Sequence, residues 1–151
     1  MELTLWQVFN LPILYLSRYV IQNKKAYYEN LQGVRDNHDW ESWILFMLDD
    51  VEKTAQETIA LIQNIKMLMQ DYKNRIRKNY SFYSQELLNN LFKHPYTKIE
   101  FIERDLDMKR LTASKYLNAL VDGGFLDKVK VGKSNFYINT PLYNLLINKT
   151  L

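Results

Sequence analysis

The chain has 151 residues, of which 47% are apolar, a net charge of +3 and no cysteine. The lack of cysteine excludes disulfide bonds and thiolate metal sites, and two histidines, His38 and His94, are too few for an imidazole cluster. The length suits one compact domain or two small ones, and we predict two, at residues 1–79 and 80–151. Basic and acidic groups balance up to residue 80, so the positive excess lies in the C-terminal half.

The apolar N-terminal stretch from Leu3 to Ile21 does not fit a membrane segment. Met1 is followed by the acidic Glu2 and not by a cationic region. Five residues interrupt the apolar run, namely Gln7, Asn10, Pro12, Ser17 and Arg18. Such a stretch is typical of neither a signal peptide nor a membrane-spanning helix. We therefore predict a cytoplasmic chain with no membrane partner.

Three helices are expected in the N-terminal half. Pro12 and Ser17 mark the expected starts of a short helix, whose apolar face is formed by Leu14, Tyr15, Tyr19, Val20 and Ile21. A second helix should cover Lys24 to Val34. Asp39 is the expected N-cap of a third helix, and neither proline nor glycine follows it until Pro95. We predict one long helix over about residues 39–78.

The long helix carries two apolar rows at heptad spacing. One row is Ile44, Val51, Thr58, Ile65 and Tyr72, and the other is Leu48, Ala55, Ile62, Met69 and Ile76. Its N-terminal end is apolar on more than one face, at Trp40, Trp43, Phe46 and Met47. We expect that end to be buried among several helices and the distal half to need only one partner. The partner helix belongs either to the same chain or to a second subunit, so a homo-oligomer through this helix or through the apolar N-terminal segment stays open.

The segment from Leu106 to Asn139 has the pattern of a winged helix-turn-helix. A helix with one apolar face is expected to end at Gly123-Gly124, because glycine accepts the left-handed conformation at little cost. A basic β-hairpin should follow, with strands at Phe125–Val131 and Asn135–Asn139 and a turn at Gly132-Lys133-Ser134. The predicted fold class is mainly α: a helical lobe with one long helix, followed by a winged helix-turn-helix domain with a small β-hairpin.

A winged helix contacts DNA through the start of this helix, called the recognition helix, and through the β-hairpin, called the wing. The candidate DNA-binding residues are Lys109, Arg110, Thr112, Ser114, Lys115, Asn118, Lys128, Lys130 and Lys133. From Lys109 to Lys133 there are six Lys and Arg residues against two acids. The alternative is a solvated basic face on a domain that packs against protein.

Several segments resemble one known family. They are Leu11-Pro12-Ile13-Leu14-Tyr15-Leu16-Ser17-Arg18-Tyr19, Tyr27-Tyr28 with Leu31, and Asp39-Trp40-Glu41-Ser42-Trp43 with Phe46-Met47-Leu48. With the helix after them, they resemble the part of Fic-family proteins that follows the catalytic loop. Thr112-Ala113-Ser114-Lys115-Tyr116-Leu117 and its wing resemble the winged helix that ends many bacterial Fic proteins. Relatives often have serine where this chain has Lys109, so we expect a side-chain N-cap to be missing at that position of the recognition helix. Thr112 would serve as the cap if the helix began later.

The resemblance implies an activity that this sequence does not complete. Fic proteins transfer AMP from ATP to a hydroxyl group of a target protein, and their active loop reads His-Pro-Phe, an acidic residue, then Gly-Asn-Gly-Arg. The His94-Pro95 pair of this chain continues without a nearby glycine, so we interpret it as a loop between helices, and His38 as a surface or capping residue. ATP and magnesium are implied only for complete relatives. We expect no catalytic, cofactor-binding or metal-binding residues here, and no enzyme activity by this chain alone.

Three functional hypotheses follow. The first is the C-terminal part of a Fic-family protein adenylyltransferase, which acts as a scaffold or regulatory part. The second is a DNA-binding winged-helix regulator, which requires Lys115 and Asn118 to face solvent beside an open wing. The third is a dimerisation or protein-interaction module.

Overall fold

The computed structural model describes residues 17–147. The predicted apolar segment up to Leu16, with the first part of the short helix, therefore lies outside the described residues. The chain forms two compact units, Met1–Ile62 and Gln63–Leu151, called here the N-terminal and C-terminal units. Each unit is described by itself.

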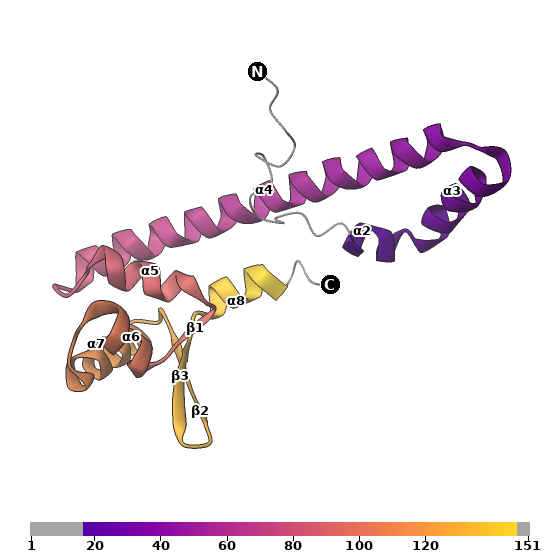
Figure 1. The fold of residues 1–151 in the computed structure, drawn as a ribbon. Helices are drawn as coiled ribbons and strands as arrows, with labels where there is room; N and C mark the ends of the chain where they lie inside the picture. The colour runs from indigo at the N-terminus through magenta and orange to yellow at the C-terminus, as the bar shows by residue number, and fades with distance from the viewer. Residues whose placement is uncertain (1–16, 148–151) are drawn as a thin grey trace. The chain divides into compact units, whose positions relative to one another are not determined.

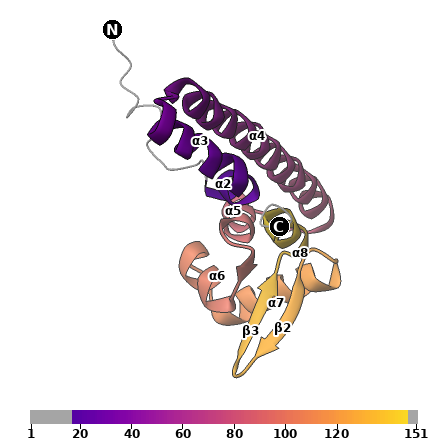
Figure 2. The same ribbon diagram turned by 90° about the vertical axis from the view of Figure 1, so that its right-hand side faces the viewer.

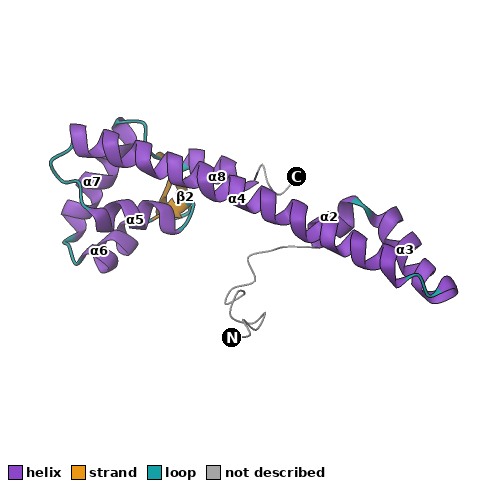
Figure 3. Cartoon of the chain, turned by 90° about the horizontal axis from the view of Figure 1, so that it is seen from above, coloured by secondary structure: helices purple, strands orange, loops and turns teal. Residues whose placement is uncertain are grey.

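Helices dominate the described residues, and strands are confined to one small region of the C-terminal unit (Figure 3). The helices are α2 (Ser17–Gln22), α3 (Lys24–Asn37), α4 (Trp40–Asn79), α5 (Gln85–Lys93), α6 (Ile99–Leu106), α7 (Arg110–Asp122) and α8 (Thr140–Ile147). The strands are β1 (Tyr96–Thr97), β2 (Asp127–Val131) and β3 (Ser134–Ile138). The predicted mainly α fold is confirmed. No helix between residues 17 and 147 combines the length and apolarity needed to cross a bilayer.

The long helix α4 is continuous, as predicted (Figure 1). Its first turn is capped by Asp39, whose Oδ1 accepts a hydrogen bond from the Ser42 backbone N–H at 3.1 Å. Hydrogen bonding with the Ser42 side chain, and then with its backbone N–H, lowers the pKa of Asp39. The preceding helix α3 runs beyond its predicted end at Val34, because its stop signal is His38, which takes the left-handed conformation at φ 57°.

The N-terminal unit is held together by aromatic side chains of α2, α3 and the start of α4. Tyr27 packs against Trp43 with ring centroids 5.2 Å apart, and Tyr19 packs against Phe46 at 5.6 Å. Trp40 nevertheless remains 58% exposed. The prediction that this end of α4 is buried among several helices therefore holds only in part for the described residues, because α2 and α3 leave Trp40 exposed while Trp43, Phe46 and Met47 are half-buried.

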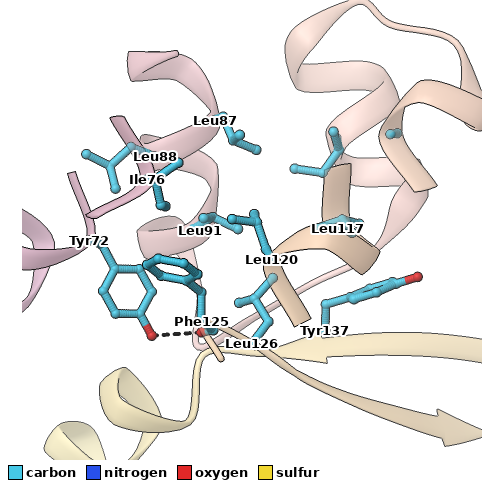
Figure 4. Close-up of a cluster of buried hydrophobic side chains, with 12 residues drawn as sticks. Tyr72, Ile76, Leu87, Leu88, Leu91, Leu117, Leu120, Phe125, Leu126 and Tyr137 are labelled. Carbon is cyan, nitrogen blue, oxygen red and sulfur yellow. Dashed lines mark hydrogen bonds between the residues drawn. The ribbon is translucent and has the colours of Figure 1, made fainter. Parts of the chain in front are cut away.

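The core of the C-terminal unit encloses the opposite end of α4 (Figure 4). Tyr72 and Ile76, the last members of the two heptad rows, are 1% exposed. Around them lie side chains of α5, α7 and the segment after it, namely Leu87, Leu88, Leu91, Leu117, Leu120, Phe125 and Leu126. The Tyr72 hydroxyl donates to the Phe125 carbonyl at 2.7 Å. The C-terminal unit thus includes the last turns of α4, so it begins before residue 80. The division into domains at residues 79 and 80 stays a prediction.

The C-terminal unit follows the element order of a winged helix-turn-helix (Figure 2). Helix α5 leads into β1, α6 and α7 come next, and the β2–β3 hairpin returns beside β1 in an antiparallel sheet of order β1-β3-β2. The predicted start of strand β2 at Phe125 is wrong. The strand begins at Asp127, because Phe125 and Leu126 are buried in the core. Strand β1 and helix α8 had no sequence prediction.

The two glycines after α7 have different roles. Gly124 takes the predicted left-handed conformation at φ 71°, whereas a Cβ on Gly123 would lie 2.1 Å from the Tyr80 hydroxyl oxygen. We expect Gly124→Ala to cost about 1 kcal/mol through backbone strain and Gly123→Ala about 1–3 kcal/mol through overpacking. Urea unfolding measures both.

The matched control is the helical Gly33, where a Cβ would meet its nearest side-chain atom, Asp39 Cβ, at an ordinary 3.8 Å. Gly33→Ala should stabilise the chain by roughly 0.5–1 kcal/mol, because alanine loses less backbone entropy in a helix. Equal changes in the free energy of unfolding at all three positions would show that neither the left-handed backbone of Gly124 nor the close approach of Tyr80 to Gly123 affects stability.

Candidate nucleic-acid interface

Helix α7 and the β2–β3 hairpin bring the predicted DNA-binding residues onto one part of the C-terminal unit. The six cations are exposed, namely Lys109, Arg110, Lys115, Lys128, Lys130 and Lys133. The three polar candidates, Thr112, Ser114 and Asn118, are half-buried. The charged part of the predicted set is therefore accessible, and the polar part is partly covered by the protein.

Asn118 is tied to the hairpin. Its Oδ1 accepts a hydrogen bond from Lys128 Nζ at 3.0 Å and lies 3.5 Å from the Tyr137 hydroxyl, while its Nδ2 donates to Ser114 Oγ at 3.3 Å. The side chain that was expected to face solvent thus fixes the hairpin against α7. A base could be read by Asn118 only if these hydrogen bonds were exchanged.

The start of α7 lacks a side-chain cap, as predicted from Lys109. Thr112 is not the N-cap either, because it already lies within the helix and its backbone N–H donates to the Lys109 carbonyl at 2.9 Å. Arg110, the first helical residue, pairs with Glu103 of α6 at 3.6 Å. The exposed backbone N–H groups of this first turn give it partial positive charge.

Three cations from separate elements line one small cavity of about 70 Å³. Lys98 precedes α6, Arg110 opens α7, and Lys133 lies in the hairpin turn. Glu100 is the acidic side chain in the lining. Sequence analysis missed Lys98, which lies before the basic segment that begins at Lys109; the signal available was its place directly before a helix. Its ammonium lies 4.3 Å from the centre of the Phe136 ring, which holds it beside the hairpin.

The two histidines have structural positions. His94 follows α5 in an extended conformation with its ring against Tyr96 at 6.3 Å, and His38 ends α3. The interpretation of His38 as a capping residue is confirmed. Among residues 17–147, no group of three or more His, Cys, Asp or Glu side chains is placed to hold a metal ion.

A second polar cluster, not found from the sequence, lies in the N-terminal unit. Lys53 Nζ donates to Asp49 Oδ2 at 2.7 Å, and the Tyr19 hydroxyl donates to the same carboxylate. The hydrogen bond from Lys53 lowers the pKa of Asp49, and the bond to Asp49 raises the pKa of Tyr19. Because the Asp49 and Lys53 side chains remain accessible to water, this cluster chiefly joins α2 to α4.

The comparison with known families concerns the C-terminal unit. Residues 68–142 match the family described as the C-terminal domain of SoFic-like protein adenylyltransferases. The C-terminal unit therefore matches a SoFic-like C-terminal domain, which supports a C-terminal fragment of a Fic-family protein. The match begins within α4, close to the buried Tyr72, and ends in α8, so it includes every element that forms the C-terminal core. The Fic resemblance of Asp39 to Leu48 lies before the matched range.

Proposed function

We propose that this chain is the helical scaffold and appended winged helix of a bacterial, cytoplasmic Fic protein adenylyltransferase, and that it does not transfer AMP by itself. The observation that carries the proposal is an apolar stripe on α4 that the described residues leave more than half exposed. The full sequence contains no His-Pro-Phe loop followed by Gly-Asn-Gly-Arg, and its four glycines are too scattered to form a phosphate cradle. ATP and magnesium would bind the part of the enzyme that carries this loop.

This stripe consists of Trp40, Ile44 and Leu48, with Leu45 beside them. These four side chains are between 52% and 59% exposed. Residues four apart lie on one face of a helix, so the stripe is a continuous apolar surface. A contiguous exposed apolar surface of this kind supports a docking role. The proposed occupant is the catalytic part of the Fic domain.

Asp50 gives independent support for an incomplete N-terminal unit. Its side chain is fully buried, and its Oδ1 accepts a hydrogen bond from the Thr54 hydroxyl at 3.0 Å. Its Oδ2 has no hydrogen-bond partner among the described residues. Burial raises the pKa of this carboxyl group. A buried, unpaired carboxylate oxygen is unfavourable. Because Asp50 is 0% exposed, a donor from the catalytic part would complete the site only if docking moved the side chains that cover Asp50.

Reconstitution tests the proposal. The chain is mixed with a folded catalytic part that contains the active loop, encoded immediately upstream or taken from a SoFic-like relative, and the mass is measured by light scattering. We expect a one-to-one complex that Ile44→Gln with Leu48→Gln abolishes. Met67→Gln is the control, because Met67 is an apolar residue of α4 outside the stripe and is 67% exposed. A folded catalytic part that never binds, or a dimer of this chain built on the same stripe, would contradict the proposal.

Duplex DNA binding is a second candidate function, favoured by the convergence of Lys98, Arg110 and Lys133 on one cavity. Cations that neutralise phosphates release counterions, so affinity should fall steeply with salt. Lys115→Ala combined with Lys133→Ala should weaken binding and flatten the logarithmic salt slope by about 0.9 for each phosphate that is no longer neutralised. Fluorescence anisotropy with mixed-sequence duplex measures this.

The control for the DNA experiment is Lys66→Ala combined with Lys78→Ala, which removes the same charge from exposed positions of α4. This variant should keep the salt slope of the parent chain. If the parent chain shows no binding at low salt, or if the two double variants behave alike, the DNA-binding function is wrong.

A further inference from the structure

The outer face of the small sheet is largely apolar, and the described residues cover it only in part. The pairing register places Tyr96, Ile138, Val129, Phe136 and Val131 on one face, and Lys128, Tyr137 and Lys130 on the other. The second face packs toward α7 through the buried Tyr137. The first face, together with Tyr143 of α8, lines a groove of about 640 Å³. Val131 at the end of this groove is 60% exposed.

The groove borders a free strand edge. Strand β2 is the outermost strand in the order β1-β3-β2, and its five side chains are all exposed. Among the described residues it pairs only with β3. An edge strand presents backbone N–H and C=O groups to which an extended peptide can add as a further strand.

The charges along β2 define what such a strand should carry. Val129 and Val131 face the groove, whereas Lys128 and Lys130 project on the opposite face. The acidic Asp127 at the start of β2 already accepts a hydrogen bond from the Thr140 hydroxyl. An added strand therefore meets apolar side chains on one face and two lysines on the other. Opposite-charge and apolar cross-strand pairs are the stabilising ones.

A second copy of this chain, paired through its own β2 about Val129, does not satisfy these conditions. If two β2 strands paired antiparallel about Val129, Lys128 of each would lie opposite Lys130 of the other. Like charges placed directly opposite each other destabilise strand pairing. Lysines on an edge also block such self-association, and they leave the edge open to a strand of opposite charge.

We propose that the β2 edge binds an extended segment of a partner protein in which apolar residues alternate with Asp or Glu. The apolar residues enter the groove beside Val129 and Val131, and the carboxylates pair with Lys128 and Lys130. Lys128 keeps its hydrogen bond to Asn118, since an ammonium group has further donors. This site is separate from the adenylyl transfer that we assign to the catalytic part, and it gives the winged helix a protein-binding role.

The test is fluorescence anisotropy with labelled peptides on the full chain. The first peptide, called the Val-Glu probe, has alternating Val and Glu residues. The second peptide has alternating Val and Lys residues. The third, called the blocked peptide, has the composition of the probe, with all Val residues in one block and all Glu residues in another. We expect saturable binding of the Val-Glu probe, at least about tenfold weaker binding of the others, and loss of binding with Val129→Asp. Lys128→Glu combined with Lys130→Glu should reverse the preference toward the Val-Lys peptide.

Lys66→Glu combined with Lys78→Glu is the matched control, since it changes the net charge equally on exposed positions of α4. This control should keep the preference for Val-Glu. The proposal is overturned if no peptide binds, if the blocked peptide binds as well as the alternating one, or if both charge variants lose binding equally. Circular dichroism confirms that each variant is folded, and Val129→Asp, at a side chain 41% exposed, provides a second variant expected to fold.

Discussion

Asn139→Ala is expected to lower the free energy of unfolding by about 3 kcal/mol, because it removes the partner of several buried polar groups at once. Asn139 is 1% exposed. Its Nδ2 donates to the Leu91 carbonyl at 3.2 Å, and its Oδ1 accepts from the Leu142 backbone N–H at 3.1 Å and lies 3.1 Å from the Tyr72 hydroxyl. One side chain thus joins α4, α5 and the first turn of α8.

The measurement for this prediction is urea unfolding of the full chain. Asn144→Ala is the matched control, because Asn144 is an exposed residue of α8, and its replacement should change stability by no more than about 0.5 kcal/mol. Tyr72→Phe should give an intermediate loss of about 1–2 kcal/mol, since the Phe125 carbonyl loses its hydroxyl donor while the ring keeps its packing. Equal losses for the two asparagine variants would contradict the assigned network.

Ile76→Ala and Ile44→Ala should have very different effects on the free energy of unfolding, although both change an isoleucine in the two heptad rows of α4, called here the heptad seam. Ile76 is 1% exposed in the C-terminal core, so its truncation leaves a cavity and should cost about 2–5 kcal/mol. Ile44 is 52% exposed and should lose less than about 1 kcal/mol, partly because alanine favours the helix. Urea unfolding of the two variants measures the difference.

This comparison distinguishes a seam that is packed at one end from a seam packed along its whole length. A loss of several kcal/mol with Ile44→Ala at low protein concentration would mean that the stripe is already covered in the isolated chain. If that loss grew with protein concentration, the cover would be a second copy. Either outcome would remove the main support for a docking surface.

Local sequence signals predicted the parts of the fold whose causes are local. The Asp39 cap, the continuous α4 and the hairpin turn at Gly132 follow from residues within a few positions of one another. The packed end of the seam could not be predicted in this way. Heptad spacing defines a face of α4, but the partners of Tyr72 come from distant residues such as Phe125 and Asn139.

The candidate interface shows the same division. Exposure of the six cations followed from their places on α7 and the hairpin. The bond between Lys128 and Asn118 did not, because it depends on how the hairpin folds back onto α7. Lys98 joined the cavity only through the pairing of β1 with β3, which brings it beside Phe136. The Tyr19–Asp49–Lys53 cluster likewise depends on the packing of α2 against α4.

The most direct test of the proposed scaffold role is incubation of the purified chain with ATP labelled in its α-phosphate, magnesium and a mixture of candidate target proteins. We predict no transfer of label to any protein, the chain itself included, and the appearance of label when an active-loop catalytic part is added. Robust labelling by this chain alone would contradict the scaffold role, because the 151 residues would then hold an ATP site of their own.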